Sequence, residues 1–308
     1  MAQSFHIWYI ASSRGQVLYR NCLIYAPWVN IYRALGVTIL QIIFPLPDTS
    51  AAIIPRQDVA RFAATNLQIS DIVVVSHELV SVSDDEKVQL IDTRVRRVVS
   101  KVKMPNRPRR QCLTRSGQLA VTMGGKKVQM INIHGQTLTK TTVLDVKKQP
   151  WGITSVGHTS FALSYKHSPW LEVIATDGTV LHQFNNEGTT QPFKYPYFLT
   201  SDEGYVYVSD RITNKITKLN FSLQLLQTFS SRLLSWPRGI VSISPDQLLV
   251  CSLRNHRIVL LNTSTGKSSI LLGEQDGIEY PRSLSYCPKQ KKLYVAKLYT
   301  DSLAVYTL

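Results

Sequence analysis

Cysteine is scarce in this chain of 308 residues, which contains only Cys22, Cys112, Cys251 and Cys287. No two of them form a Cys-x-x-Cys pair, so the sequence lacks the ligand spacing of a zinc finger or a RING domain. Four scattered cysteines are also too few for a disulfide framework. They favour a reducing compartment, and we therefore expect a cytoplasmic protein.

Long apolar runs are missing as well. The run from Ala34 to Phe44 has 11 residues, well short of the ~20 that a membrane-spanning helix needs. The N-terminus has no basic region and no clear cleavage site of a signal peptide. Residues 1–54 are therefore predicted to be an apolar N-terminal extension outside the main domain, which spans residues 55–308. A degenerate signal anchor and a non-native segment both stay open for this extension, and a membrane partner is not expected.

Acidic residues are nearly absent from residues 93–148. This stretch holds 14 Lys and Arg and a single acid, Asp145, whereas the remaining residues carry 21 basic and 19 acidic side chains. The net charge of +15 therefore comes almost entirely from one stretch. A concentrated positive charge favours polyanionic partners such as nucleic acid or another anionic surface.

The most informative feature that is present is a block that recurs about every 42 residues. Successive copies open at intervals of 42, 46, 41 and 44 residues, at Pro108, Pro150, Pro196, Pro237 and Pro281. Each proline precedes a short apolar stretch, a turn, an alternating strand, a second turn and another alternating strand. Units of four short strands at this period are typical of propeller blades. The sequence therefore predicts an all-β fold, a six-bladed β-propeller.

The first and last blades depart from this pattern. The first begins near Asp71 without an opening proline, and the last ends at Leu308 after only three predicted strands. A three-stranded blade would leave an unpaired edge, which is an aggregation liability. We therefore predict that a strand within Asp58–Ala64 completes the last blade by antiparallel pairing with Ser302–Thr307.

The fifth block has the most specific motif: Pro237, Gly239 and Ile240, then an alternating strand, then Asn255-His-Arg-Ile258. This motif resembles the NHL repeat, and the match extends with less fidelity over about four-fifths of the chain. The chain lacks the Trp-Asp dipeptide of WD40 blades and the recurring Gly-Gly of kelch blades. It is similar to the C-terminal propellers of animal tripartite-motif (TRIM-NHL) proteins. That resemblance implies recognition of RNA or protein partners, while ubiquitin-ligase activity would require a RING domain that this sequence does not contain.

Some propeller enzymes hold a metal in the central channel with His, Glu or Asp side chains. The corresponding positions here follow the opening prolines, and they read Arg109-Arg110, Trp151-Gly152, Tyr197-Phe198, Arg238-Gly239 and Arg282-Ser283. None of these is a metal ligand, whereas a catalytic zinc needs three protein ligands. We therefore predict a non-catalytic protein with no metal, no cofactor and no small-molecule substrate.

The same positions fit a binding face better. We expect the residue after each proline to lie in a loop on one rim of the ring, beside the turn between the second and third strands. The candidate binding residues from both sets are basic or aromatic: Arg109, Arg110, Lys126, Lys127, Trp151, Tyr197, Arg211, Arg238, Arg254, His256 and Arg282. Cations that meet phosphates and rings that stack on bases suit single-stranded nucleic acid.

Two functions stay open at this point. The predicted function is a binding module for single-stranded RNA, and the alternative is a protein-interaction scaffold or the substrate receptor of a ubiquitin-ligase-type protein. Four cations of the basic stretch fall on a predicted outer strand rather than on the rim: Arg94, Arg96, Lys101 and Lys103. That placement weakens the RNA interpretation and is compatible with an acidic protein or a membrane surface, while RNA stays slightly favoured over protein.

Overall fold

The computed structural model describes residues 30–34, 37–41, 62–63, 68–184 and 192–308. Near the N-terminus, β1 (Asn30–Ala34) and β2 (Val37–Gln41) pair as an antiparallel hairpin. The rest of the predicted N-terminal extension lies outside the described residues, as does Cys22. The division of the chain into an extension of residues 1–54 and a domain of residues 55–308 stays a prediction.

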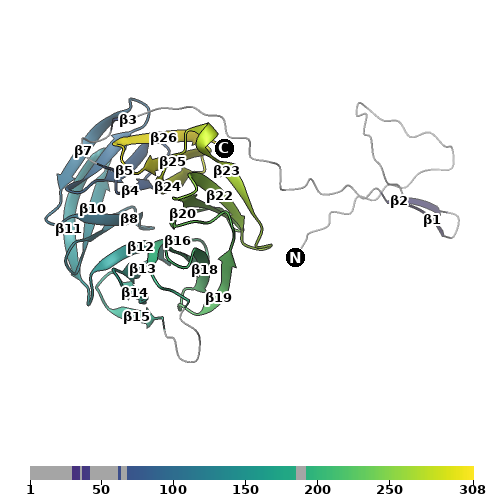
Figure 1. Ribbon diagram of the computed structural model, residues 1–308, viewed down its shortest axis with the longest axis horizontal. Coiled ribbons are helices and arrows are strands. Elements are labelled where there is room, and N and C mark those ends of the chain that lie inside the picture. Colours follow the sequence, from purple (N-terminus) through teal and green to yellow (C-terminus); the bar gives the residue numbers. More distant parts are fainter. Residues whose placement is uncertain (1–29, 35–36, 42–61, 64–67, 185–191) are drawn as a thin grey trace. The chain divides into compact units, whose positions relative to one another are not determined.

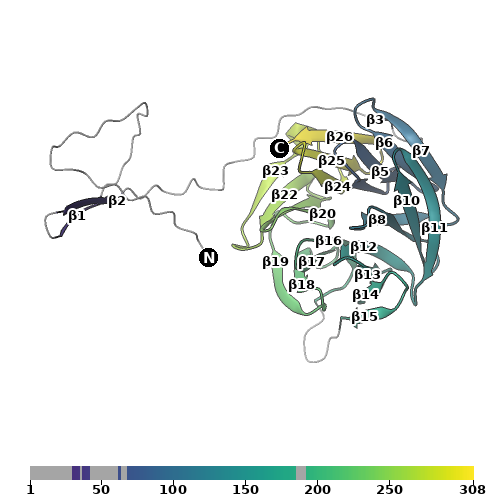
Figure 2. The ribbon, with the colours of Figure 1, turned by 180° about the vertical axis from the view of Figure 1, so that it is seen from behind.

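The C-terminal unit is a ring of six four-stranded antiparallel blades, which confirms the predicted all-β propeller (Figures 1 and 2). Blades 1 to 3 consist of β4 (Asp71–Val74), β5 (Leu79–Ser83), β6 (Lys87–Asp92), β7 (Arg97–Lys103); β8 (Pro108–Leu113), β9 (Leu119–Met123), β10 (Lys127–His134), β11 (Thr137–Asp145); β12 (Pro150–Val156), β13 (Ser160–Tyr165), β14 (Leu171–Ala175), β15 (Val180–Gln183). Blades 4 to 6 consist of β16 (Pro196–Ser201), β17 (Tyr205–Asp210), β18 (Lys215–Asn220), β19 (Leu225–Ser230); β20 (Pro237–Ser244), β21 (Gln247–Ser252), β22 (Arg257–Asn262), β23 (Ser268–Leu272); β24 (Pro281–Cys287), β25 (Lys292–Lys297), β26 (Ser302–Thr307), β3 (Phe62–Ala63). A short 3-10 helix, η1 (Glu274–Asp276), precedes blade 6.

The position of a strand within its blade determines how much of it is buried. The second strands are covered on both faces by neighbouring blades, and all five residues of β9 are buried. The outermost strands follow the circumference of the ring (Figure 1), and β11 buries only Leu138 and Leu144 of its nine residues. Strands such as β9 and β21 therefore read as nearly continuous apolar runs, as expected of strands that are buried on both faces.

The core is divided among the interfaces between blades. Separate clusters of buried side chains join each adjacent pair, including blade 6 with blade 1. The cluster between blades 3 and 4, for example, packs Val173 against Phe193 and Val206. At about 25 cal/mol per Å² of buried apolar surface, this packing is the main force that holds the blades together.

Strand β3 closes the ring. Ala63 pairs with Ser302 and Phe62 pairs with Leu303, both in antiparallel register, so β3 is the fourth strand of blade 6. This pairing confirms the predicted closure within Asp58–Ala64, although most of that segment lies outside the described residues. The edge of β26 is thus covered, and the chain gains contacts between residues far apart in sequence.

Candidate functional site

The innermost strands begin at the same end of the ring as the turns between the second and third strands. In blade 2, Pro108 pairs with Met123, and Met123 also pairs with Lys127. The other blades repeat this register, so both predicted sets of residues gather at one end, as expected. We call this end, formed by the starts of the innermost strands and these turns, the proline face.

The residues after the opening prolines are not in exposed loops, and that expectation is wrong. Each proline is the first residue of an innermost strand, where its missing N–H costs no ladder hydrogen bond. Most of the following side chains are buried, whereas Arg109 is half-buried. Trp151 is 9% exposed, Tyr197 5%, Arg110 3%, and Arg238 and Arg282 8% each.

Three buried arginines surround Tyr197 at the centre of the proline face. The guanidinium carbons of Arg110 and Arg238 lie 5.1 and 4.9 Å from the centroid of the Tyr197 ring. Arg238 Nη1 donates to the Tyr197 hydroxyl at 3.3 Å, and Arg110 lies 3.7 Å from the centroid of Phe198. Each residue comes from a different blade except Tyr197 and Phe198. We call Arg110, Arg238 and Arg282 the arginine trio.

The electrostatics of this cluster are those of like charges held out of water. Burial and the repulsion of Arg110 lower the pKa of Arg282 to about 10, with a further contribution from Arg238. Burial also lowers the pKa of Arg238. For Tyr197, burial would raise the pKa, but the surrounding guanidinium groups, Arg110 first, outweigh it and lower the pKa. The cluster therefore favours negative charge at its centre.

Hydroxyl groups at the ends of the second strands position these residues. Thr122 Oγ1 donates to the carbonyl oxygen of Trp151 at 2.8 Å, and Ser209 Oγ donates to that of Arg238, also at 2.8 Å. Both bonds join one blade to the next. The small polar residue near the end of each of these second strands can be recognised in the sequence. In the structure it fixes the innermost strand of the next blade.

Around the centre, cations cover the faces of two tryptophans. Arg109 and Lys166 lie 4.7 and 5.8 Å from the centroid of Trp151. Arg211 and Arg254 lie 4.1 and 3.6 Å from the centroid of the half-buried Trp236, which is not among the predicted binding residues. These rings already contact cations, so the prediction that aromatic side chains are free platforms for bases does not hold for Trp151 or Tyr197.

The remaining predicted residues lie at the periphery of the proline face. Lys126 is exposed, whereas Lys127 forms an ion pair with Asp145 at 2.8 Å. His256 packs on the exposed Tyr280, with ring centroids 4.1 Å apart, and its Nδ1 lies 3.5 Å from a carboxylate oxygen of Glu274. Lys127 and His256 therefore each lie beside an acid, Lys127 at the shorter distance.

Asp210 joins two segments of the proline face. Its buried carboxylate accepts hydrogen bonds from the backbone N–H groups of Lys194 and Tyr195 at 2.6 and 2.7 Å, and from those of Ile212 and Thr213 at 2.9 Å each. The first pair leads into β16 and the second lies in the turn after β17. Asp210 thus ties two loops of its own blade together.

The basic stretch of residues 93–148 is divided between several surfaces. Arg94 lies in the turn after β6, at the opposite end of the ring, and pairs with Asp92 and Glu78 at 3.0 and 3.1 Å. Lys101 and Lys103 are exposed on β7, at the circumference, as the sequence predicted. The parts that include Arg109, Arg110, Lys126 and Lys148 reach the proline face.

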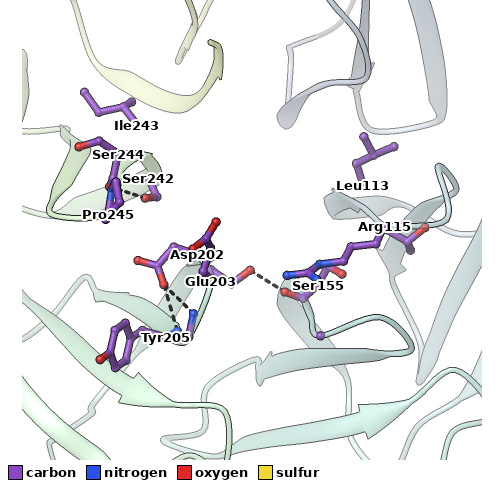
Figure 3. A pocket seen from close by; sticks show the side chains of 14 residues that line it. Leu113, Arg115, Ser155, Asp202, Glu203, Tyr205, Ser242, Ile243, Ser244 and Pro245 are labelled. Atoms are coloured by element: carbon purple, nitrogen blue, oxygen red, sulfur yellow. Dashed lines mark hydrogen bonds between the residues drawn. The ribbon is translucent and has the colours of Figure 1, made fainter.

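A pocket of about 590 Å³ lies at the opposite end of the innermost strands (Figure 3). Its walls come from the ends of β8, β12, β16 and β20 and the turns that follow, and they include Leu113, Arg115, Asp202, Tyr205 and Ile243. This pocket was not predicted from the sequence. Small polar residues at the ends of the innermost strands, such as Ser155 and Ser201, were the available signal, and Ser201 Oγ donates to the Ser155 carbonyl at 2.5 Å.

Two further observations bear on function. Among the described residues, no group of three or more His, Cys, Asp or Glu side chains is arranged to hold a metal ion. No helix in this part of the chain is long and apolar enough to cross a membrane. The expected absence of catalysis and cofactors stays a prediction.

The fold and the site define a six-bladed β-propeller with a cationic, aromatic end. No family model matches the chain, and no curated protein matches it in sequence. Solved structures share the fold: the β-propeller domain of Cps50 (Swd1) from Myceliophteria thermophila matches with a TM-score of 0.56 and 14% identity, over 78% of this chain and 83% of that one. A streptogramin B lyase matches with a TM-score of 0.59 and 15% identity, over 84% and 89% of the two chains.

The virginiamycin B lyase of Staphylococcus aureus also shares the fold, with a TM-score of 0.58 and 15% identity, over 82% of this chain and 89% of that one. At these identities the comparisons establish the propeller architecture alone. A β-propeller domain and two lyases occur among the similar structures, so function must be argued from the side chains of this chain.

Proposed function

We propose that this propeller is a non-catalytic module that binds single-stranded RNA on its proline face. The proposal is supported by the distribution of charge among the blades. The turns between the second and third strands of blades 2 to 5, at residues 124–126, 166–170, 211–214 and 253–256, contain cations and no acid. The equivalent turns of blades 1 and 6, at residues 84–86 and 298–301, contain acids and no cation.

This arrangement gives the face a basic arc, which we define as Lys126, Lys166, Arg211 and Arg254. The arc follows four successive blades around the proline face. A backbone of phosphates that lay along it would meet one cation per blade, and each contact would release counterions. The acids of blades 1 and 6 would repel phosphates and so confine the bound RNA to blades 2 to 5. The repeat resemblance to TRIM-NHL propellers agrees with this proposal.

Base stacking would use guanidinium planes rather than free rings. Arg254 is exposed and lies 3.6 Å from the centroid of Trp236, so its outer face is available to a base. RNA bases stack on guanidinium planes as well as on aromatic side chains. The exposed Tyr280 and Tyr299, whose centroids are 5.8 Å apart, provide further rings, and Tyr280 also packs on His256.

The test is a titration of the full chain against a randomised pool of single-stranded RNA, followed by fluorescence anisotropy at several salt concentrations. The double variant Lys126→Glu with Arg254→Glu removes two cations of the basic arc. If each contacts a phosphate, the slope of log K against log salt should fall in magnitude by about 1.4, at ~0.7 for each lost contact.

The matched control is Lys101→Glu with Lys103→Glu, which makes the same change in net charge on the circumference. RNA affinity and its salt slope should change much less in this control. Equal losses in both double variants would mean that binding follows net charge rather than the proline face. The absence of RNA binding by the unmodified chain would reject the proposal.

Protein binding is the second candidate, and the pocket at the opposite end of the ring favours it. A volume of about 590 Å³ lies in the range of ligand sites, and its mixed walls of Ile243, Asp202 and Arg115 suit a peptide side chain. A photoreactive group in place of Tyr205, which is 38% exposed, should crosslink a partner at this end. The same group in place of Lys126 should not.

A further inference from the structure

We propose that the arginine trio at the centre of the proline face forms a buried binding site for a phosphate group. The trio consists of Arg110 from β8, Arg238 from β20 and Arg282 from β24, and each side chain is at least nine-tenths buried. The site is separate from the basic arc, which lies on the surrounding turns. It does not depend on the RNA proposal, because an isolated phosphate would satisfy the same donors.

The charge of the cluster is not balanced by the protein. Among the described residues, the acid that acts on the trio is Asp71, at the start of β4, which interacts with Arg110 and Arg282. Its carboxylate already accepts hydrogen bonds from Ser283 Oγ at 2.5 Å and from Gln111 N at 2.8 Å. Burial raises the pKa of Asp71 despite the nearby Arg110. Three guanidinium groups therefore face at most one carboxylate.

Several donors of the cluster are also unused. Within the part of the chain that the structure describes, Arg110 Nε and Nη2, Arg238 Nε and Arg282 Nε are buried and have no protein acceptor. The indole Nε1 of Trp151 is also buried without a protein acceptor, and the Trp151 ring centroid lies 5.3 Å from that of Tyr197. Buried donors are normally satisfied, and a buried charge without a partner is costly. Such a set of donors fits a ligand that only accepts hydrogen bonds.

The excess charge selects among anions. A phosphate group carries about −1.5 to −2 charges near neutral pH, which matches an excess of about two guanidinium groups. Its oxygens accept hydrogen bonds only and suit the planar donor sets of several arginines. Chloride offers one charge and no directed lone-pair geometry. The ligand is therefore a phosphate group, either inorganic phosphate or the terminal phosphate of an oligonucleotide.

The first experiment measures the melting temperature of the full chain while inorganic phosphate is titrated at constant ionic strength against chloride. Phosphate should raise the melting temperature with saturation, since it binds the folded state alone. In Arg282→Met the phosphate dissociation constant should rise about tenfold or more, as expected for the loss of a charge-assisted hydrogen bond. In the matched control Arg97→Met, on the exposed start of β7, it should not change.

The melting temperature of the phosphate-free protein distinguishes a phosphate-binding arginine from a purely structural one. Because Arg282→Met relieves repulsion within the trio, its melting temperature without phosphate should equal or exceed that of the wild type. If the variant does not fold, the wild-type chain still provides a measurement. Phosphate should raise the pKa of Tyr197, followed by phenolate absorbance and assigned with Tyr197→Phe, whereas chloride should leave it unchanged.

The source of the phosphate is distinguished with two short oligoribonucleotides that differ only in a 5′-phosphate. Tighter binding of the phosphorylated one by the wild type but not by Arg282→Met would identify an RNA end. Equal binding of both, together with saturable binding of inorganic phosphate, would identify free phosphate. If phosphate has no saturable effect, or acts equally on the wild type and Arg282→Met, the proposed site is wrong, whether or not the basic arc binds RNA.

Discussion

Gly239 is the position where a single added methyl group should do most to test the packing of the ring. A Cβ at this position would lie 2.7 Å from Ser283 Cα, 3.0 Å from Leu284 N and 3.1 Å from the Arg282 carbonyl oxygen. All three atoms belong to the backbone of the next blade. Gly239 thus permits the close approach of β20 and β24, and it lies between two members of the arginine trio.

The expected cost of Gly239→Ala follows from these distances. Non-bonded carbon atoms prefer separations of about 3.5–4.0 Å, so the two strands would have to separate by roughly 0.8 Å or more. Overpacking typically costs ~1–3 kcal/mol, and backbone atoms cannot rotate away as a side chain would. We therefore expect a loss of about 3 kcal/mol, or a decrease in melting temperature of about 6–12 °C for a ring of this size.

The assay is thermal and denaturant unfolding of Gly239→Ala beside Gly204→Ala. At Gly204 an added Cβ would meet no atom within 4 Å, and the backbone is not left-handed. Gly204→Ala should therefore change the free energy of unfolding by less than about 0.5 kcal/mol. If Gly239→Ala is as stable as Gly204→Ala, the close approach of blades 5 and 6 is wrong, and with it the geometry of the arginine trio.

Three other outcomes are expected. Deletion of residues 57–66 removes β3 and exposes the edge of β26, so it should lower the melting temperature or cause oligomerisation seen by light scattering; a monomer with unchanged melting would contradict ring closure. Asp210→Ala leaves four backbone donors without their acceptor, so the free energy of unfolding measured by chemical denaturation should fall by about 3 kcal/mol or more. Asp210→Asn should lower it by less. If both variants are as stable as the wild type, these hydrogen bonds contribute little. The lowered pKa of Tyr197 means that its phenolate forms in the folded state below the unfolded value of about 10. Its contribution to stability should therefore increase as the pH rises toward that value and be lost as the pH falls through the folded pKa. An absorbance titration in which Tyr197→Phe removes no early phenolate signal would refute this.

The extent of correct prediction differs between the scaffold and the site. The recurring prolines and alternating strands predicted the blades, because each blade is a local unit whose strands are joined by short turns. Ring closure by residues near Asp58–Ala64 was predictable from the missing fourth strand, since an open edge is unfavourable. Both inferences depend on short-range patterns and on counting strands.

The surroundings of the site residues were not predictable in the same way. The sequence correctly placed Arg238 and Arg282 after their prolines and at one end of the ring, but not their burial. The sequence around the start of one innermost strand does not show which residues of the other blades will contact it. Burial arises because the innermost strands of all the blades converge on one axis, which brings Arg110, Tyr197 and Arg238 together from separate repeats.

The sequence by itself therefore determined the number of blades, their strand order and the end of the ring at which basic and aromatic residues gather. These features follow from periodicity and from the fixed direction of each strand. Only the tertiary structure decided that Trp236 is covered by two arginines, that Lys127 is neutralised by Asp145, and that three arginines share one buried centre. The physical reason is that such contacts join side chains far apart in the chain, whose distances depend on how the blades close into a ring.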